Sequence, residues 1–130
     1  MCDFGSCVES PIYIRNVDER TAADEHIQKE TTQMYRAPEM VDLYLRPTLT
    51  EKTDIWALGC MLFAMCFLIH PFMDGSSLGI LNAKVHFPAD SPFPADLHAL
   101  ILRLLDVSTW RCLYLCHVPL FTNCALCTCI

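Results

Sequence analysis

The chain has 130 residues, of which 53% are apolar and 18% are charged. This apolar content excludes general disorder, because such a chain can bury a hydrophobic core. The length corresponds to one domain or to part of one. Fifteen acidic residues outnumber nine basic ones and give a formal net charge of −6. Nucleic-acid binding is therefore not expected, because it needs a basic face to meet the phosphates.

The nine cysteines do not form a regular disulfide framework, because their spacing is uneven. Four are scattered over residues 1–111, and five crowd the last 19 residues. No signal peptide is recognisable, since polar and acidic residues follow Met1. We therefore expect free thiols and a reducing, cytoplasmic location.

The N-terminal part of the chain is its most polar part. Residues 16–30 show weak apolar periodicity and are predicted to form an exposed, mobile loop. Pro38 is placed to begin a short helix, because a proline costs no hydrogen bond in the first helical turn. Arg46-Pro47 should end this segment, since the proline ring disfavours helical backbone at the preceding residue.

A long uncharged segment follows between residues 55 and 73. Thr53 or Asp54 is expected to cap the helix that begins it, and we place this central helix at about 54–69. The apolar length approaches that of a membrane span, but His70-Pro71 interrupts it and aspartates flank it. A helix that is apolar all round is also typical of the centre of a globular core. We favour the buried helix.

The last predicted element is an amphipathic helix that Asp96 can cap. Its apolar side chains recur with helical spacing, and His98 and Arg103 fall on the opposite face. The apolar face consists of Leu97, Leu100, Ile101, Leu104 and Leu105. The chain is thus predicted to be mainly α-helical.

Three short motifs occur in a fixed order: Asp3-Phe4-Gly5, Ala37-Pro38-Glu39 and Asp54-Ile55-Trp56-Ala57-Leu58-Gly59. Each is common alone, but their order and spacing resemble the C-terminal half of a protein kinase domain. Two further stretches, Thr32-Gln33-Met34-Tyr35-Arg36 and His70-Pro71-Phe72-Met73-Asp74-Gly75, make the chain similar to the Numb-associated kinase family. Within that family it most resembles the cyclin-G-associated kinase group. The resemblance covers residues 1 to about 107.

The resemblance implies both a fold and an activity. The fold would be the helical C-lobe portion of a protein-kinase-like fold, incomplete because the N-lobe and the catalytic loop precede the first motif in this family. Residues 1–107 would form the partial domain, with the activation segment at 3–39. The intact family transfers phosphate from ATP to serine and threonine, notably on clathrin-adaptor proteins, and works in endocytic trafficking.

The resemblance also assigns roles in binding ATP and substrate. Asp3 would hold the Mg²⁺ that bridges the ATP phosphates. Phe4 would set the placement of Asp3, and Gly5 would let the backbone turn there. Thr32 would contact the catalytic base and shape the substrate site, as in serine/threonine kinases.

Tyr35, Glu39, Asp54 and Gly59 would have structural roles. In the family the glutamate pairs with an arginine further along the chain, and the aspartate braces the catalytic loop from the central helix. The family places that arginine at position 112, where this chain has Cys112, with Arg111 one step out of register. A buried Glu39 needs some partner, because a buried charge loses its hydration.

The 130 residues contain no glycine-rich loop, no phosphate-binding lysine motif and no catalytic loop. We therefore expect no catalytic base in this chain, no productive binding of ATP and Mg²⁺, and no phosphate transfer by the chain alone. A non-catalytic docking module derived from a kinase C-lobe is the alternative function. A membrane-anchored helical protein is a third possibility that rests only on the apolar segments, and we expect at most a peripheral association with trafficking membranes.

Residues 108–130 form a cysteine-rich apolar tail that resembles no kinase helix. The family pattern stops at Val107-Ser108, and residues 112–130 carry no charge. We interpret the tail as sequence that is not native to a kinase, such as translated intron or frameshifted sequence. A membrane tail anchor and a zinc site are the alternatives. The zinc ligands would be drawn from Cys112, Cys116, His117, Cys124, Cys127 and Cys129.

Overall fold

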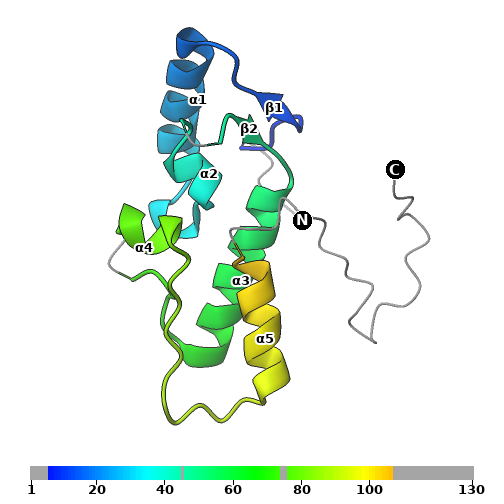
Figure 1. Cartoon of the computed structure of the whole chain (residues 1–130), viewed down its shortest axis with the longest axis vertical. Helices are drawn as coiled ribbons and strands as arrows, with labels where there is room; N and C mark the ends of the chain where they lie inside the picture. Colours follow the sequence, from blue (N-terminus) through cyan, green and yellow to red (C-terminus); the bar gives the residue numbers. More distant parts are fainter. Residues whose placement is uncertain (1–5, 45, 74–75, 107–130) are drawn as a thin grey trace, which may run out of the picture.

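The computed structural model describes residues 6–44, 46–73 and 76–106, and every structural statement below concerns these residues. They are mainly α-helical, as predicted, with one small antiparallel pair of strands (Figure 1). In chain order the elements are β1 (Ile12–Tyr13), α1 (Val17–Glu30), the 3-10 helix η1 (Gln33–Tyr35), α2 (Pro38–Val41), β2 (Thr48–Leu49), α3 (Lys52–Phe67), α4 (Ser77–Leu81) and α5 (Ala95–Leu104).

Helix α1 contradicts the sequence prediction, which made residues 16–30 a mobile loop. The Asn16 side chain accepts a hydrogen bond from the Glu19 N–H at 2.8 Å, and the Glu19 carboxylate accepts one from the Arg15 N–H at 2.7 Å. This reciprocal capping satisfies amides that a helix N-terminus leaves unpaired. Ile27 is the buried residue of an otherwise solvated helix, so no apolar stripe reveals it in the sequence.

Strands β1 and β2 pair with Ile12 opposite Leu49 and Tyr13 opposite Thr48. The strand pair and α1 occupy the upper part of Figure 1, above α3 and α5. A small core fills the space between them. Its buried side chains are Ile14, Ile27, Leu43 and Leu49.

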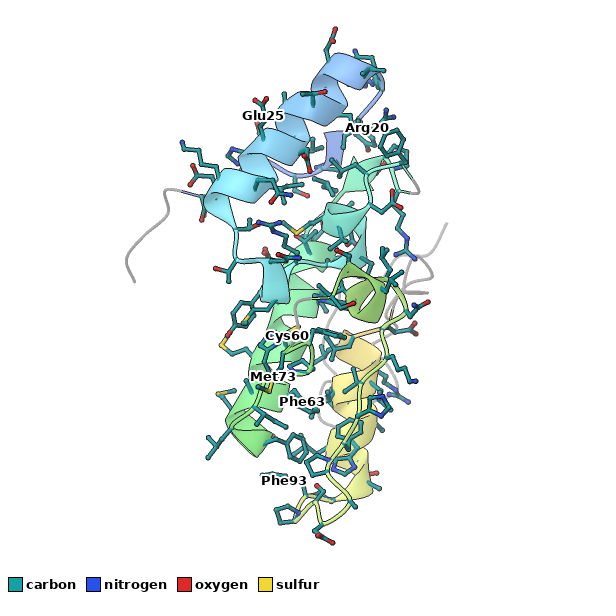
Figure 2. The ribbon with its side chains drawn as sticks, turned by 90° about the vertical axis from the view of Figure 1, so that its left-hand side faces the viewer. Arg20, Glu25, Cys60, Phe63, Met73 and Phe93 are labelled. Atoms are coloured by element: carbon teal, nitrogen blue, oxygen red, sulfur yellow. The ribbon has the colours of Figure 1, made fainter. Side chains whose placement is uncertain are left out.

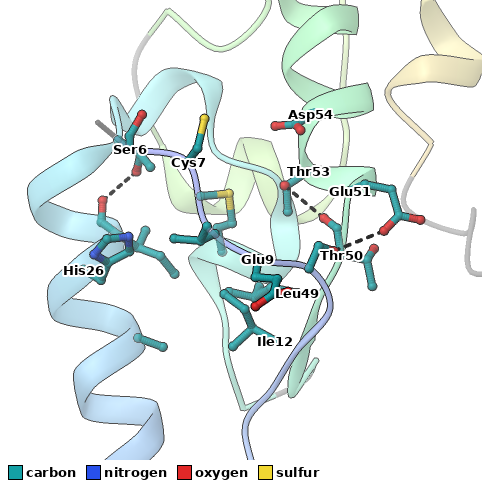
Figure 3. Close-up of a pocket in the computed structure, with 16 residues that line it drawn as sticks. Ser6, Cys7, Glu9, Ile12, His26, Leu49, Thr50, Glu51, Thr53 and Asp54 are labelled. Atoms are coloured by element: carbon teal, nitrogen blue, oxygen red, sulfur yellow. Dashed lines mark hydrogen bonds between the residues drawn. The ribbon is translucent and has the colours of Figure 1, made fainter. Parts of the chain in front are cut away.

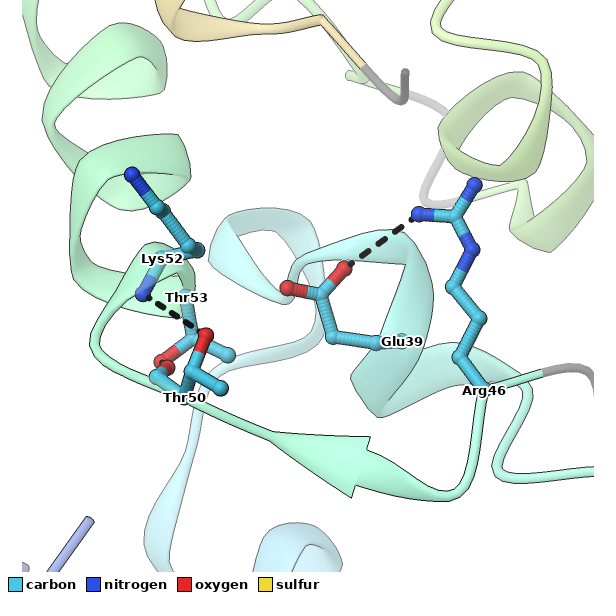
Figure 4. Close-up of polar contacts among 5 residues, drawn as sticks. All are labelled: Glu39, Arg46, Thr50, Lys52 and Thr53. Carbon is cyan, nitrogen blue, oxygen red and sulfur yellow. Dashed lines mark hydrogen bonds and ion pairs between the residues drawn. The ribbon is translucent and has the colours of Figure 1, made fainter. Parts of the chain in front are cut away.

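Helix α3 spans Lys52–Phe67 rather than the predicted 54–69. Its N-cap is Glu51, so the predicted caps Thr53 and Asp54 lie inside the helix. The Thr50 hydroxyl, just before the cap, accepts a hydrogen bond from the Lys52 N–H at 3.3 Å (Figure 4). The helix ends where Leu68 adopts the left-handed conformation, with φ of 55°. No helix among the described residues has both the length and the apolar character needed to cross a membrane.

A larger core runs along α3, which lies beside α5 in both views (Figures 1 and 2). Gly59 lies at a close approach of the two helices, because a Cβ added there would be 2.8 Å from Leu105 Cδ2 and 2.9 Å from Leu104 Cβ. Burial raises the pKa of the Cys60 thiol to about 12, so this thiol is a protonated core group. The buried members are Ala37, Trp56, Cys60, Phe63, Phe72, Ile80, Ile101 and Leu105.

Helix α5 follows the predicted pattern on its apolar face, where Ile101 and Leu105 are fully buried. His98, predicted on the opposite face, instead stacks on Phe87 with the ring centroids 4.4 Å apart. Its Nε2 also forms a hydrogen bond with the Ser91 hydroxyl at 2.8 Å. The helical period could not reveal this contact, because the segment before α5 folds back along the helix.

Candidate functional site

The three residues that the resemblance assigns to ATP and Mg²⁺ lie outside the described residues, and so does the cysteine-rich tail with its possible zinc ligands. Within the described part of the chain, no three His, Cys, Asp or Glu side chains are grouped so that they could hold a metal ion. The residues assigned to the substrate side and to the scaffold are described. They lie in residues 31–39, which we call the 31–39 loop, and in α3.

Arg36 fastens the 31–39 loop to the C-terminal end of α1. Its buried guanidinium donates from Nε to the Thr31 hydroxyl and from Nη2 to the Thr31 carbonyl, both at 2.8 Å. Nη1 donates to Gln28 Oε1 at 2.9 Å. The Thr31 hydroxyl donates in turn to the Ile27 carbonyl at 2.6 Å. One of these bonds gives a partner to the Thr31 carbonyl, which lies just past the last residue of α1 and has none within the helix.

Thr32 is exposed at the start of η1, where its carbonyl accepts a hydrogen bond from the Tyr35 N–H at 3.0 Å. The Tyr35 ring contacts His70 edge to face, with centroids 4.7 Å apart. His70 Nδ1 accepts a hydrogen bond from the Phe72 N–H at 3.2 Å, and burial lowers the pKa of the imidazole. A neutral His70 therefore supports the 31–39 loop from the segment after α3.

Glu39 has a partner that the sequence analysis did not foresee. Its carboxylate is buried, and Arg46 Nη1 lies 3.8 Å from Glu39 Oε2 (Figure 4). Arg46 is the basic residue of the segment between α2 and β2, so a cation among the described residues lies beside this buried carboxylate. Position 112 itself lies outside the described residues. The sequence does offer this partner for Glu39, because Arg46 is the first basic residue after the Ala37-Pro38-Glu39 motif.

Asp54 is exposed on the first turn of α3, and Gly59 is buried further along the same helix. Asp54 borders a pocket of about 330 Å³ that lies between residues 6–12, α1 and the start of α3 (Figure 3). The sequence does not reveal this pocket, because α1, which forms one wall, is a helix without an apolar stripe. The pocket is lined by Ser6, Cys7, Val8, Glu9, Ser10, Ile12, Ala23, His26, Ile27, Thr31, Met40, Leu49, Thr50, Glu51, Thr53 and Asp54.

Comparison with known proteins identifies the family. Residues 1–110 match the protein kinase domain family. The chain belongs to that family. The kinase domain matches two probable serine/threonine-protein kinases of Dictyostelium discoideum, with 44% identity over 106 residues and 45% identity over 105 residues. It is also 39% identical over 105 residues to actin-regulating kinase 1 of Saccharomyces cerevisiae.

These matches cover 82%, 81% and 81% of this chain but 9%, 13% and 16% of the respective relatives. The chain thus spans only a small part of the curated relatives that it matches. The predicted membership of the protein kinase family is confirmed, and the names of two of these relatives describe them as probable serine/threonine-protein kinases. Kinases of this family use ATP and Mg²⁺ and act on protein substrates.

Proposed function

We propose that this chain is the substrate-facing C-lobe portion of a serine/threonine protein kinase of the Numb-associated type, near the cyclin-G-associated kinase group. The observation that carries the proposal is the 31–39 loop. Arg36 fixes the loop with charge-assisted hydrogen bonds, and Thr32 remains exposed beside it. Such an arrangement orders a loop while leaving a hydroxyl free to meet other groups.

In this proposal residues 3–39 are the activation segment, and the cysteine-rich tail beyond the family match, which ends at residue 110, is not kinase sequence. Asp3 binds the Mg²⁺ that bridges the ATP phosphates, Phe4 sets its placement and Gly5 permits the turn. Thr32 contacts the catalytic base of the complete domain. The substrates are proteins of the clathrin-adaptor type, and the kinase works in the cytoplasm at the periphery of trafficking membranes.

Four residues act as scaffold in this proposal. Tyr35 rests on the segment after α3, Glu39 pairs with a neighbouring arginine, and Gly59 lets α5 approach α3. Asp54 braces the catalytic loop of the complete domain. Residues 1–130 alone transfer no phosphate, because these 130 residues contain neither the phosphate-binding lysine motif nor the catalytic loop with its aspartate base.

The test is a chimaera in which residues 1–106 replace the matching segment of the Dictyostelium relative that is 44% identical over 106 residues. We expect the chimaera to phosphorylate a clathrin-adaptor peptide. Asp3→Asn should nearly abolish transfer, and Thr32→Ala should lower turnover with little change in ATP affinity. Thr21→Ala is the matched control, because Thr21 is an exposed hydroxyl on α1 outside the 31–39 loop. A folded chimaera whose turnover is unchanged by Thr32→Ala would contradict the assigned role.

The second candidate function is a non-catalytic docking module. One observation favours it: the pocket beside Asp54 is open, has apolar walls and carries charges of one sign. Docking requires no ATP site, so the isolated chain could perform it. Peptide binding by residues 1–130 in the absence of nucleotide is the measurement that separates this function from phosphate transfer.

A further inference from the structure

His70 joins the 31–39 loop to the larger core. Its ring meets the Tyr35 ring edge to face, with the centroids 4.7 Å apart, and its Nδ1 accepts a hydrogen bond from the Phe72 N–H at 3.2 Å. Phe72 is buried and stacks on Trp56 of α3, with the centroids 5.5 Å apart. The imidazole therefore lies between a core residue that is held by packing and the loop that carries the exposed threonine.

The loop side of this contact leads directly to Thr32. The Tyr35 N–H donates to the Thr32 carbonyl at 3.0 Å, and the Arg36 N–H donates to the Gln33 carbonyl at 3.1 Å. These bonds close the short helix η1, which has no side-chain cap of its own. Arg36 ties the loop to α1, and His70 supports the same short helix from the segment after α3. A shift of the Tyr35 ring would therefore carry Thr32 with it.

The hydrogen bond from Phe72 fixes the tautomer of the neutral imidazole. Nδ1 of His70 accepts that bond, so the proton of the neutral ring is on Nε2. Nε2 is buried and has no hydrogen-bond partner among the described residues. Because these residues already cover Nε2, a neighbouring segment cannot reach it without displacing them.

No carboxylate of the described residues forms an ion pair with His70. Burial lowers the pKa of the imidazole, so a proton on Nδ1 brings a charge into a place where no such carboxylate meets it. The charged side chains of the neighbouring elements pair elsewhere or lie in the first turn of α3, at the opposite end from His70. The titratable and charged side chains of the 31–39 loop and α3 are Tyr35, Arg36, Glu39, Lys52, Asp54, Cys60 and Cys66.

We propose that His70 is a positioning residue that holds Thr32 in place only while its imidazole is neutral. A proton taken up from water by Nδ1 turns this acceptor into a donor, so the hydrogen bond from the Phe72 N–H is lost. The ring then moves away from the repelling N–H, and Tyr35 loses its edge-to-face contact. This inference rests on the proposed function, because the released Thr32 lowers phosphate transfer by the complete domain in acid.

Hydrogen exchange in residues 1–130 measures the release without any kinase activity. The Tyr35 amide is the reporter, because its hydrogen bond closes η1. His70→Asn is the reference at each pH, since the asparagine oxygen can accept the Phe72 N–H but does not titrate. We expect the Tyr35 exchange rate of the wild type, relative to His70→Asn, to rise about fivefold between about pH 8 and about pH 5, which corresponds to one lost hydrogen bond. The same ratio for α5 amides should stay constant.

Two further variants separate the proton from the contact. His70→Phe keeps a ring against Tyr35 but has no acceptor, so it should exchange faster than the wild type near pH 8 and show no additional acid release. His86→Asn is the matched control, because it removes an exposed imidazole between α4 and α5. It should keep the full acid response of the wild type. Circular dichroism of each variant verifies that the helices persist.

The pH profile of the chimaera then measures the consequence for turnover. The kcat of the parent chimaera, relative to its His70→Asn variant, should fall about fivefold in acid while the KM for ATP changes equally in both, since Thr32 lies on the substrate side. The proposal is overturned if Tyr35 exchange responds to acid identically in the wild type and both His70 variants, or if an active chimaera shows a constant kcat ratio. An inactive chimaera with acid release at Tyr35 supports the His70 contact and contradicts the proposed kinase function.

Discussion

Replacing Gly59 by alanine tests whether the contact between α3 and α5 holds the larger core together. The new Cβ would lie 2.8 Å from Leu105 Cδ2 and 2.9 Å from Leu104 Cβ, both closer than carbon atoms normally approach. The leucine methyl can rotate away, but the Leu104 Cβ is fixed to the α5 backbone, so α5 itself must move. Overpacking of this kind costs about 1–3 kcal/mol.

The same substitution also improves helix propensity, by about 1 kcal/mol for glycine to alanine. The net cost at Gly59 is therefore about 1 kcal/mol. Gly79 in α4 provides the matched control, since a Cβ there would lie 3.9 Å from Ser76 Cβ and 4.0 Å from Phe72 Cδ1, which is ordinary contact. Gly79→Ala should stabilise its helix by about 0.5–1 kcal/mol, because it gains propensity without a clash.

Hydrogen exchange on peptides from α3, α4 and α5 measures both effects without requiring a monomer. A change of 1.4 kcal/mol alters the opening equilibrium tenfold, so Gly59→Ala should speed exchange in α3 and α5 by about fivefold. Gly79→Ala should slow exchange in α4. Adding Leu105→Ala to Gly59→Ala should cost less than the sum of the separate changes, because the two side chains compete for one space. Slower exchange in Gly59→Ala would refute the close-approach argument.

Three other substitutions test the 31–39 loop. Arg36→Met should lower the local free energy of unfolding at the end of α1 by about 2 kcal/mol, which is roughly 30-fold faster hydrogen exchange around Thr31. An unchanged exchange rate would contradict the role given to the Arg36 hydrogen bonds. Arg46→Met should lower the free energy of unfolding by about 1–3 kcal/mol at neutral pH, because it leaves Glu39 buried without this cation. Adding Glu39→Gln to this variant should recover part of the lost stability. Burial lowers the pKa of His70 below its ordinary 6.5. The contribution of the neutral imidazole to the free energy of unfolding is therefore full above about pH 6.5 and is lost as the pH falls through the pKa of the folded state. His70→Phe should make hydrogen exchange less sensitive to acid.

Much of the α3–α5 half was predictable, because α3 is a long uncharged run and the apolar residues of α5 recur with a helical period. The uncharged run gave α3 to within two residues at each end, and the leucine spacing gave the buried face of α5. Pro38 likewise marks the start of α2, where a proline is tolerated. In each case one local signal, periodicity or backbone chemistry, agrees with the tertiary packing.

Helix α1 was not predictable in this way because its stability comes from its ends. The capping pair of Asn16 and Glu19 fixes the first turn, and Arg36 binds the Thr31 carbonyl and the Gln28 side chain at the other end. A prediction from apolar period alone gives no weight to these polar contacts. The Glu39 partner was missed for a related reason, since the family pattern directed attention to position 112 rather than to Arg46, which the chain brings back beside α2.

Ile27 is the residue through which the small core positions the 31–39 loop. Its side chain is buried beneath β1 and β2, so the orientation of its backbone is fixed by apolar packing. Its carbonyl accepts hydrogen bonds from both the hydroxyl and the N–H of Thr31, at 2.6 and 3.1 Å. Thr31 in turn presents two oxygens to Arg36, which holds the loop on the far side of Thr32. One apolar residue in a polar helix therefore determines where the exposed threonine lies, and this explains why a segment without an amphipathic pattern is ordered beside the proposed substrate site.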